Sequence, residues 1–62
     1  MDKILLNPLE AAEALGISRA FLYKLIALGR IRTVRIGRAR RIPAEELQRF
    51  VRELLEEGDH ER

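Results

Sequence analysis

Three consecutive residues, Gly16, Ile17 and Ser18, constrain this chain more than any other stretch of its sequence. Glycine readily adopts the left-handed conformation that ends a helix, and serine is among the preferred residues for beginning one. Helical patterns lie directly on both sides of these residues, over positions 8–15 and 18–28. The sequence therefore predicts two short helices that meet at a tight corner, with the Ile17 side chain in the angle between them.

The first of these helices carries strong starting signals. Asn7 is a good N-cap, Pro8 suits the first helical position, and Glu10 is spaced to complete a capping box with Asn7. The predicted helix runs to Leu15 and stops at Gly16. Because it has barely two turns, it cannot persist alone and must pack against the rest of the chain.

The second predicted helix, capped by Ser18 and closed by Gly29, has two different faces. With a rotation of about 100° per residue, Leu22, Leu25 and Ile26 fall together on a face that we expect to be buried. The opposite face combines two cations, a phenol and small alanines, and its members are Arg19, Ala20, Tyr23, Lys24 and Ala27. That face can approach a groove closely, and Phe21 falls on the boundary between the two faces.

The net charge of +2 conceals an uneven distribution of charge along the chain. Residues 16–43 hold eight cationic side chains and no carboxylate, whereas residues 1–15 and 44–62 are both acidic overall. A cationic segment of this kind attracts polyanions by counterion release. A solvated charged surface is the simpler alternative, but such surfaces usually mix both signs. The eight cations are Arg19, Lys24, Arg30, Arg32, Arg35, Arg38, Arg40 and Arg41.

After the second helix, the pattern changes to an alternation that is typical of strands. It predicts a hairpin whose strands are residues 33–36 and 40–42, the first of them half-buried. We expect a three-residue loop, residues 37–39, because only that register places the aliphatic side chains of both strands on one face. Those side chains are Val34, Ile36 and Ile42.

The same register has a consequence for the arginines of the hairpin. It places Arg35 directly opposite Arg41 on the outer face, where like charges repel each other. Arg38 lies at the exposed tip, and Arg40 lies on the inner face. A hairpin that keeps a repulsive pair of this kind is suited to hold an anion.

The last predicted helix is the longest, from Ala44 to about Glu57, and its amphipathic stripe is suited to pack on the core. The pair Glu45 and Arg49, spaced i, i+4, favours an exposed outer face. We expect residues 58–62 to form a loose tail. The whole chain, residues 1–62, is then a single domain with an ordered core over about residues 5–57.

The composition restricts the classes of function that the chain can have. There is no cysteine, the one histidine is His60 in the tail, and the one serine is used as a helix cap. No carboxylate lies in the cationic segment, so neither an acid–base pair nor a metal cage can form there locally. We therefore expect no enzyme activity, no catalytic or metal site, no cofactor and no small-molecule substrate. No apolar run approaches the roughly 20 residues of a membrane span, so we expect a cytoplasmic location and no membrane partner.

Two short helices joined by a corner that contains glycine form the helix-turn-helix arrangement. A plain pair of antiparallel helices without a nucleic-acid role is the alternative. The cations argue against it, because residues 8–15 have none, whereas the second helix has Arg19 and Lys24 on its outer side. The predicted fold class is mainly α with a small β-hairpin, a winged helix-turn-helix in the order helix, helix, two-stranded wing, helix.

The ordered set of these segments resembles the small winged helix-turn-helix proteins of the excisionase type, which are relatives of the MerR-like DNA-binding domains. The resemblance covers roughly residues 5–55. It rests on residues 10–12 and 15–19 at the corner, residues 22–26 in the second helix, and residues 34–38 and 41–43 in the wing.

The resemblance implies sequence-specific binding of double-stranded DNA, with the second helix in the major groove and the wing on the backbone or minor groove. Members of the family serve as excisionases, which bend DNA beside an integrase and set the direction of recombination of a mobile element. Others are small transcriptional regulators, which is the alternative role. The family also implies an integrase or recombinase as protein partner, head-to-tail self-association on DNA, and a place on the nucleoid of a bacterium or on phage DNA.

Arg19 is the predicted base contact, because it lies in the first turn of the second helix and arginine on guanine is the commonest specific contact. A contact to phosphate alone is the alternative for it. Lys24 is expected on phosphate, while Tyr23 either contacts the backbone or is a half-buried structural residue. The complete set of predicted DNA-binding residues is Ser18, Arg19, Ala20, Tyr23, Lys24, Arg35, Arg38, Arg40 and Arg41.

A protein-binding adaptor is the competing hypothesis from another class. In that case the apolar edge of the second helix, with Phe21, would bind a protein such as an integrase, and DNA binding would be secondary. RNA binding is a further option, but RNA-binding sheets usually expose stacking aromatics, and no aromatic residue falls in the predicted strands.

Overall fold

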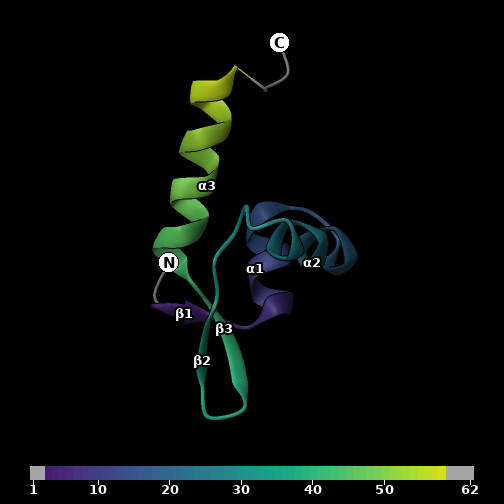
Figure 1. Ribbon diagram of the computed structural model, residues 1–62, viewed down its shortest axis with the longest axis vertical. Coiled ribbons are helices and arrows are strands. Elements are labelled where there is room, and N and C mark those ends of the chain that lie inside the picture. Colours follow the sequence, from purple (N-terminus) through teal and green to yellow (C-terminus); the bar gives the residue numbers. More distant parts are fainter. Residues whose placement is uncertain (1–2, 59–62) are drawn as a thin grey trace.

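The computed structural model describes residues 3–58, which form three helices and three short strands (Figure 1). In chain order they are β1 (Leu5–Leu6), α1 (Pro8–Leu15), α2 (Arg19–Ala27), β2 (Val34–Ile36), β3 (Ala39–Pro43) and α3 (Ala44–Glu57). The hairpin of β2 and β3 lies at one end of the longest axis and the C-terminal end of α3 lies at the other. The predicted class, mainly α with a wing in the order helix, helix, wing, helix, is confirmed.

The caps that the sequence predicts at both ends of α1 and at the beginning of α2 are present. The side-chain oxygen of Asn7 accepts a hydrogen bond from the Glu10 N–H at 2.8 Å, and the Glu10 carboxylate accepts one from the Asn7 N–H at 2.9 Å. Gly16 ends α1 with a φ of 73°, in the left-handed region. The Ser18 hydroxyl then accepts a hydrogen bond from the Phe21 N–H at 3.1 Å and begins α2. Local hydrogen bonds therefore fix where α1 begins and ends and where α2 begins.

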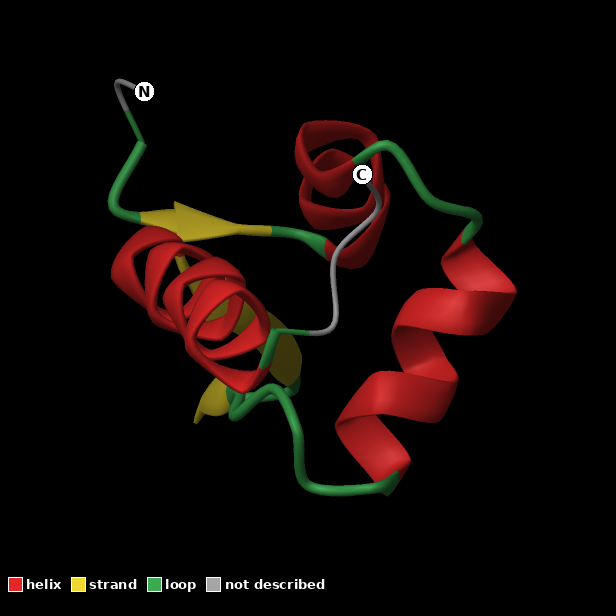
Figure 2. Ribbon diagram, turned by 90° about the horizontal axis from the view of Figure 1, so that it is seen from above, coloured by secondary structure: helices red, strands yellow, loops and turns green. Residues whose placement is uncertain are grey.

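The core receives a buried side chain from every described helix and strand except β2. Two adjacent alanines of α1 are buried, which lets the neighbouring elements approach closely. The three helices surround this core when the molecule is seen from above (Figure 2). Its members are Leu6, Ala11, Ala12, Leu22, Leu25, Ile31, Ile42, Leu47 and Phe50.

The sheet has one strand that the sequence did not predict. β1 pairs with β3 in the antiparallel sense, with Leu5 opposite Pro43 and Leu6 opposite Ile42, so the strand order is β1-β3-β2. A strand of two residues is too short to show an alternating pattern, which is why the sequence predicted only a two-stranded wing. β1 ties the base of β3 to the beginning of α1.

The predicted register of the wing is wrong. β2 and β3 are joined by a two-residue loop, and Val34 lies opposite Arg41, not opposite Ile42. Gly37, the first loop residue, has a φ of 61°, and no described residue other than glycine has a positive φ. Positive φ at the first loop position alone is the pattern of a type II′ turn, which favours glycine there and matches the twist of the strands.

The physical reason for the error is the exposure of β2. The prediction required all the aliphatic side chains of the hairpin to share a buried face. Ile42 is fully buried, but Val34 and Ile36 are 42% and 60% exposed. Burial therefore does not require these two side chains to lie on the same face as Ile42. The expectation of a half-buried first strand is wrong for the same reason, and the chemistry of the turn sets the register.

α3 has the predicted bounds, but only its first half packs fully against the core. Leu47 and Phe50 are buried, whereas Val51, in the middle of the helix, and Leu55, near its end, are exposed. The expected pair of Glu45 with Arg49 is replaced by ion pairs from Arg49 to Glu46 and to Glu53. Residues 59–62 of the predicted tail lie outside the described residues.

Candidate nucleic-acid interface

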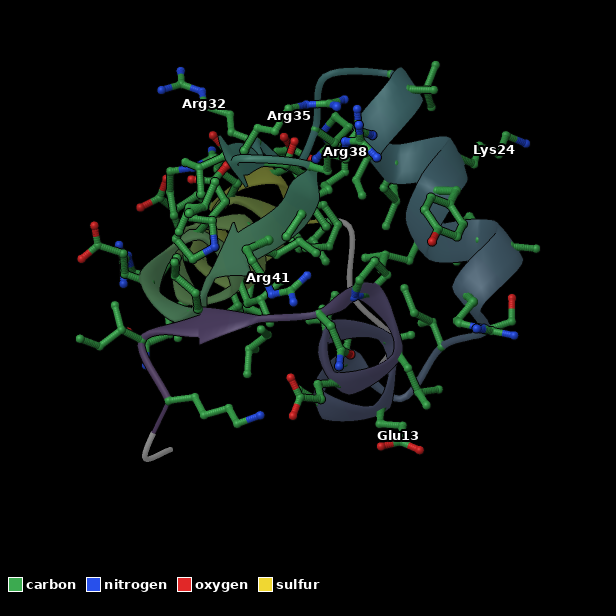
Figure 3. The ribbon with its side chains drawn as sticks, turned by 90° about the horizontal axis from the view of Figure 1, so that it is seen from below. Glu13, Lys24, Arg32, Arg35, Arg38 and Arg41 are labelled. Atoms are coloured by element: carbon green, nitrogen blue, oxygen red, sulfur yellow. The ribbon has the colours of Figure 1, made fainter. Side chains whose placement is uncertain are left out.

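The outer face of α2 presents all of the contacts that the sequence predicted for this helix. Leu22 and Leu25 are buried on the opposite side, and this packing fixes the rotation of the helix about its axis. The exposed set comprises Ser18, Arg19, Ala20, Tyr23 and Lys24. Lys24 points away from the body of the molecule (Figure 3). The helix therefore offers cationic, hydroxyl and small side chains on one accessible surface.

Phe21 lies on the edge of this surface that faces α3. Its side chain is 49% exposed, and it lines an apolar groove of about 380 Å³ together with Phe50 and Leu54 of α3. Ile17 and Leu25 contribute to the same groove. Phe21 thus contributes to the apolar edge of the core, and the cationic face of α2 begins beyond it.

The arginines of the wing are paired differently from the sequence prediction. Arg35 lies directly opposite Arg40, whereas Arg41 lies opposite Val34. The expected pair of Arg35 with Arg41 is therefore wrong, because the loop is one residue shorter than expected. A repulsive cross-strand pair nevertheless exists on one face of the hairpin, and both of its members are exposed. Arg38 is exposed in the loop at the tip.

Arg41 is separated from the other three arginines of the wing. It lies on the side of the hairpin near β1 and α1, whereas Arg35 and Arg38 extend on the side toward α2 (Figure 3). The Arg41 side chain is partly buried and donates a hydrogen bond to the Arg40 carbonyl at 2.9 Å. The structure thus brings together three of the four predicted wing contacts and places the fourth on the other face.

The neighbour of Arg41 in α1 is a carboxylate, Glu10. The pKa of Glu10 is lowered, first by its hydrogen bond from the Lys3 ammonium, then by the Asn7 N–H, and least by the charge of Arg41. Glu10 is partly neutralised by these groups, and Glu13 points away from the wing (Figure 3). Glu10 therefore lies beside Arg41, on the other side of the hairpin from Arg35 and Arg38.

The helix-turn-helix domain family matches residues 5–54, a stretch that begins in β1 and ends in the last turns of α3. The chain belongs to this family. This helix-turn-helix protein is also 43% identical, over 54 residues, to a probable excisionase of Saccharopolyspora erythraea. The matched stretch covers 87% of the chain and 55% of that relative, so the chain spans about half the length of the curated relative it matches. No solved structure matches the chain significantly. The resemblance to helix-turn-helix proteins of the excisionase type is confirmed.

The connection between α2 and the wing is held by contacts that the sequence did not predict. One Glu46 carboxylate oxygen of α3 accepts a hydrogen bond from the Arg32 N–H at 2.9 Å. Arg49, one turn further along α3, donates to the Arg30 carbonyl at 2.9 Å and to Glu46 through its Nε at 3.1 Å. The two contacts with the backbone of Arg30 and Arg32 join residues 19 and 14 apart in sequence, so no local pattern signals them.

The charged side chains around this connection stabilise one another. The hydrogen bond from Arg49 lowers the pKa of Glu46, against the effect of burial, which raises it. Arg30 stacks over the Phe50 ring, 5.4 Å from its centre, and contacts Glu57 at 3.4 Å, whereas Arg32 is exposed. Arg30 is thus engaged by α3, whereas Arg32 faces solvent.

Two further observations concern only residues 3–58 of this helix-turn-helix protein. Within that range, no three histidine, cysteine, aspartate or glutamate side chains are grouped so that they could hold a metal ion. None of the described helices has the length and apolar character that crossing a membrane requires.

Proposed function

We propose that this helix-turn-helix protein binds double-stranded DNA sequence-specifically, with α2 in the major groove and the wing on the backbone or minor groove. One observation carries the proposal: the cationic face of α2 is exposed while its opposite face is fixed in the core by Leu22 and Leu25. A major groove about 12 Å wide admits an α-helix. A helix held by its apolar side can therefore present its outer side to the bases without rearrangement.

The roles of the α2 residues follow from their places on the helix. Arg19 lies in the first turn, where recognition helices usually meet base edges, and we assign it the base contact. Ala20 allows close approach, and the Ser18 cap leaves the helix N-terminus available to a phosphate. Tyr23 and Lys24 lie about one turn later, and we assign them to the sugar–phosphate backbone.

The arginines of the wing supply contacts that do not depend on sequence. Arg35 and Arg40 repel each other in the free protein, and a phosphate between them would relieve that repulsion. Arg38 at the tip extends the same surface. Arg41 contributes positive charge from the other face of the hairpin. Contacts of this kind position a protein on the duplex, while α2 supplies specificity.

The biological role that we propose is that of an excisionase, which directs the recombination of a mobile element. The support is the 43% identity to a probable excisionase, although the chain spans only about half of that relative. This role adds an integrase as protein partner and a second copy of the chain as neighbour on DNA. A small transcriptional regulator with the same DNA-binding surface is the alternative.

A salt titration of duplex binding tests the proposal. Four or five phosphate contacts predict that log K falls with log salt with a slope of about −4. Arg19→Ala should remove the preference for the target site, whereas Arg38→Ala should weaken all sequences alike and reduce the slope by about 1. Absence of duplex binding even at low salt would refute DNA binding, and equal loss of preference in both variants would contradict this division of roles.

The excisionase role has its own test. Where an integrase gene lies beside the gene for this chain, the integrase should form excision junctions only when the protein is present. Junctions that form equally well without it would leave the transcriptional role as the better proposal. Changed expression of a reporter carrying the bound site would then be expected.

The protein-binding adaptor remains a second candidate because of the apolar groove between α2 and α3. Phe21 lies at its edge, and Leu54 and Phe50 line it. Phe21→Ala should weaken capture of an integrase and leave duplex affinity unchanged if the groove binds protein. Loss of duplex affinity in the same variant would argue against a separate protein-binding role.

A further inference from the structure

We infer that Glu46 and Arg49 of α3 are positioning residues that set the orientation of the wing relative to α2. Neither side chain belongs to the cationic faces of α2 or the wing. Both instead contact the connection that joins these two surfaces. The inference rests on the proposed function only where DNA binding is the readout, because the orientation itself can be measured in the free protein.

The need for such residues follows from how weakly the wing is attached. All three residues of β2 are exposed, and β2 contributes no side chain to the core. β3 is held at its base, where Ile42 is buried and pairs with Leu6 of β1. Further from the core, the wing depends on the pairing of its own two strands and on the path by which the chain enters β2.

That path is fixed by α3 at two residues, one on each side of a buried side chain. The Ile31 side chain is only 1% exposed, and the backbone groups on either side of it are bound by α3. The Arg30 carbonyl accepts a hydrogen bond from Arg49, and the Arg32 N–H donates one to Glu46. Bonds to the backbone on both sides of a buried side chain determine position and direction, so the chain enters β2 at a defined angle.

The guanidinium of Arg49 suits this role better than another cation would. Its planar fork donates to the Arg30 carbonyl, to Glu46 and to Glu53 at the same time. A lysine carries the same charge but offers a single ammonium, so it cannot span these acceptors in a fixed geometry. Glu46 is 9% exposed and shares its two oxygens between Arg49 and the Arg32 N–H.

A wing that is already fixed before binding favours affinity, because an ordered surface loses less conformational freedom when the complex forms. α2 and the wing must contact one duplex at the same time. If the wing swings freely, its arginines no longer add to the contacts of α2. The affinity for DNA would then fall because the two surfaces no longer bind together, while the protein remains folded.

The first test measures the orientation without DNA. The chain has no cysteine, so Lys24→Cys and Arg38→Cys allow spin labels to be placed on α2 and at the tip of the wing. Arg49→Lys should broaden the distance distribution between the labels. Arg52→Lys is the matched control, because Arg52 is exposed on the same helix and should leave the distribution unchanged. Equal distributions in the two variants would overturn the inference.

The second test uses duplex DNA and a double-mutant cycle. In the unchanged protein, Arg38→Ala should reduce the salt slope by about 1. In the Arg49→Lys background, Arg38→Ala should cost at least threefold less affinity than in the Arg52→Lys background. An equal cost in the two backgrounds would overturn the inference. If the unchanged protein binds no duplex DNA, the proposed function fails and the label distances alone decide the inference.

A second variant tests the inference if Arg49→Lys fails to fold. Glu46→Gln keeps the size of the side chain and an oxygen for the Arg32 N–H, but it removes the charge that pairs with Arg49. Glu45→Gln removes the same charge from the exposed neighbouring residue and is its control. With far-ultraviolet circular dichroism unchanged, broader label distances in Glu46→Gln alone would support the inference. Identical distances in both variants would refute it.

Discussion

The corner between α1 and α2 and the wing are held in place by different means. At the corner, each helix end has its own hydrogen-bonded cap, and the side chains on either side of it enter the core. The wing has an exposed edge strand, a repulsive pair formed by Arg35 and Arg40, and no core side chain from β2. The corner is thus stabilised by its own residues, whereas the wing takes its position from contacts at its base.

This difference separates residues that stabilise the fold from residues that carry the proposed interface. Repulsion between Arg35 and Arg40 contributes nothing favourable to folding, so their presence is better explained by an anionic partner. Arg19 and Lys24 can occupy the surface of α2 because Leu22 and Leu25 hold that helix from the other side. Substitutions in the corner should therefore change stability, and substitutions in the wing should change binding.

The largest expected effect compares one aliphatic truncation in each region. Leu22→Ala removes a side chain that is 0% exposed and should cost about 2–5 kcal/mol of unfolding free energy. Such a loss is comparable with the whole stability of so small a domain. Ile36→Ala, on the exposed strand of the wing, should change the stability by less than about 0.5 kcal/mol. Urea unfolding followed by circular dichroism measures both, and similar losses would contradict the comparison.

The next prediction uses two glycines that share the left-handed backbone conformation. Gly16 and Gly37 have φ values of 73° and 61°, and a Cβ added at either would meet nothing within 4 Å. Alanine at each position should therefore cost about 1–2 kcal/mol locally, from the left-handed backbone alone. For Gly16→Ala the loss should appear in global unfolding. For Gly37→Ala it should appear as faster amide hydrogen exchange confined to β2 and β3. Faster exchange across α1 and α2 in Gly37→Ala would show that the wing and the corner unfold together.

The sequence predicts α1 and the corner that follows it well because their signals are local. Asn7, Gly16 and Ser18 each act within four residues of their own position, through caps whose chemistry depends little on the rest of the chain. The bounds of α3 follow from signals of the same kind, since Pro43 precedes it and Gly58 ends it. The nine predicted DNA-binding residues remain a prediction, although eight of them are exposed and Arg41 is partly buried.

The register of the wing needed information that periodicity does not contain. The aliphatic pattern suggested a shared face, but Gly37 followed by Arg38 is itself a signal for a type II′ two-residue turn. The contacts of Glu46 and Arg49 with the connection could not be predicted, because their partners are 14 and 19 residues away in the sequence. Such contacts depend on how α3 packs on the core.

A smaller effect is expected from the cap of α2. Ser18→Ala removes the acceptor for the Phe21 N–H and should cost about 1 kcal/mol of unfolding free energy. Ser18→Asp keeps an acceptor at the same place and should retain most of the stability. Thermal unfolding of the two variants beside the unchanged protein measures the difference. If Ser18→Ala is as stable as Ser18→Asp, the corner does not depend on this cap.

The smallest expected effect is a dependence of stability on acidic pH. The pKa values of Glu10, in the first turn of α1, and Glu46, at the base of the wing, are both lowered in the folded protein. A carboxyl group with a lowered pKa stabilises the fold above its unfolded pKa of about 4.3, and this contribution is lost as the pH falls through the folded pKa. Stability should therefore be level between about pH 7 and pH 5 and fall below about pH 4.

Glutamine variants show how much of this loss of stability at acidic pH comes from each of the two carboxyl groups. Glu10→Gln and Glu46→Gln should each flatten the pH dependence of urea unfolding, because neither side chain can then take up a proton. Glu45→Gln should leave it unchanged, since Glu45 is exposed and forms no ion pair among the described residues. Amide hydrogen exchange at low pH shows which segment loosens first. Protonation of Glu46 should loosen the connection and β2 before α1. Loosening of α1 first would mean that the wing is held more firmly than α1.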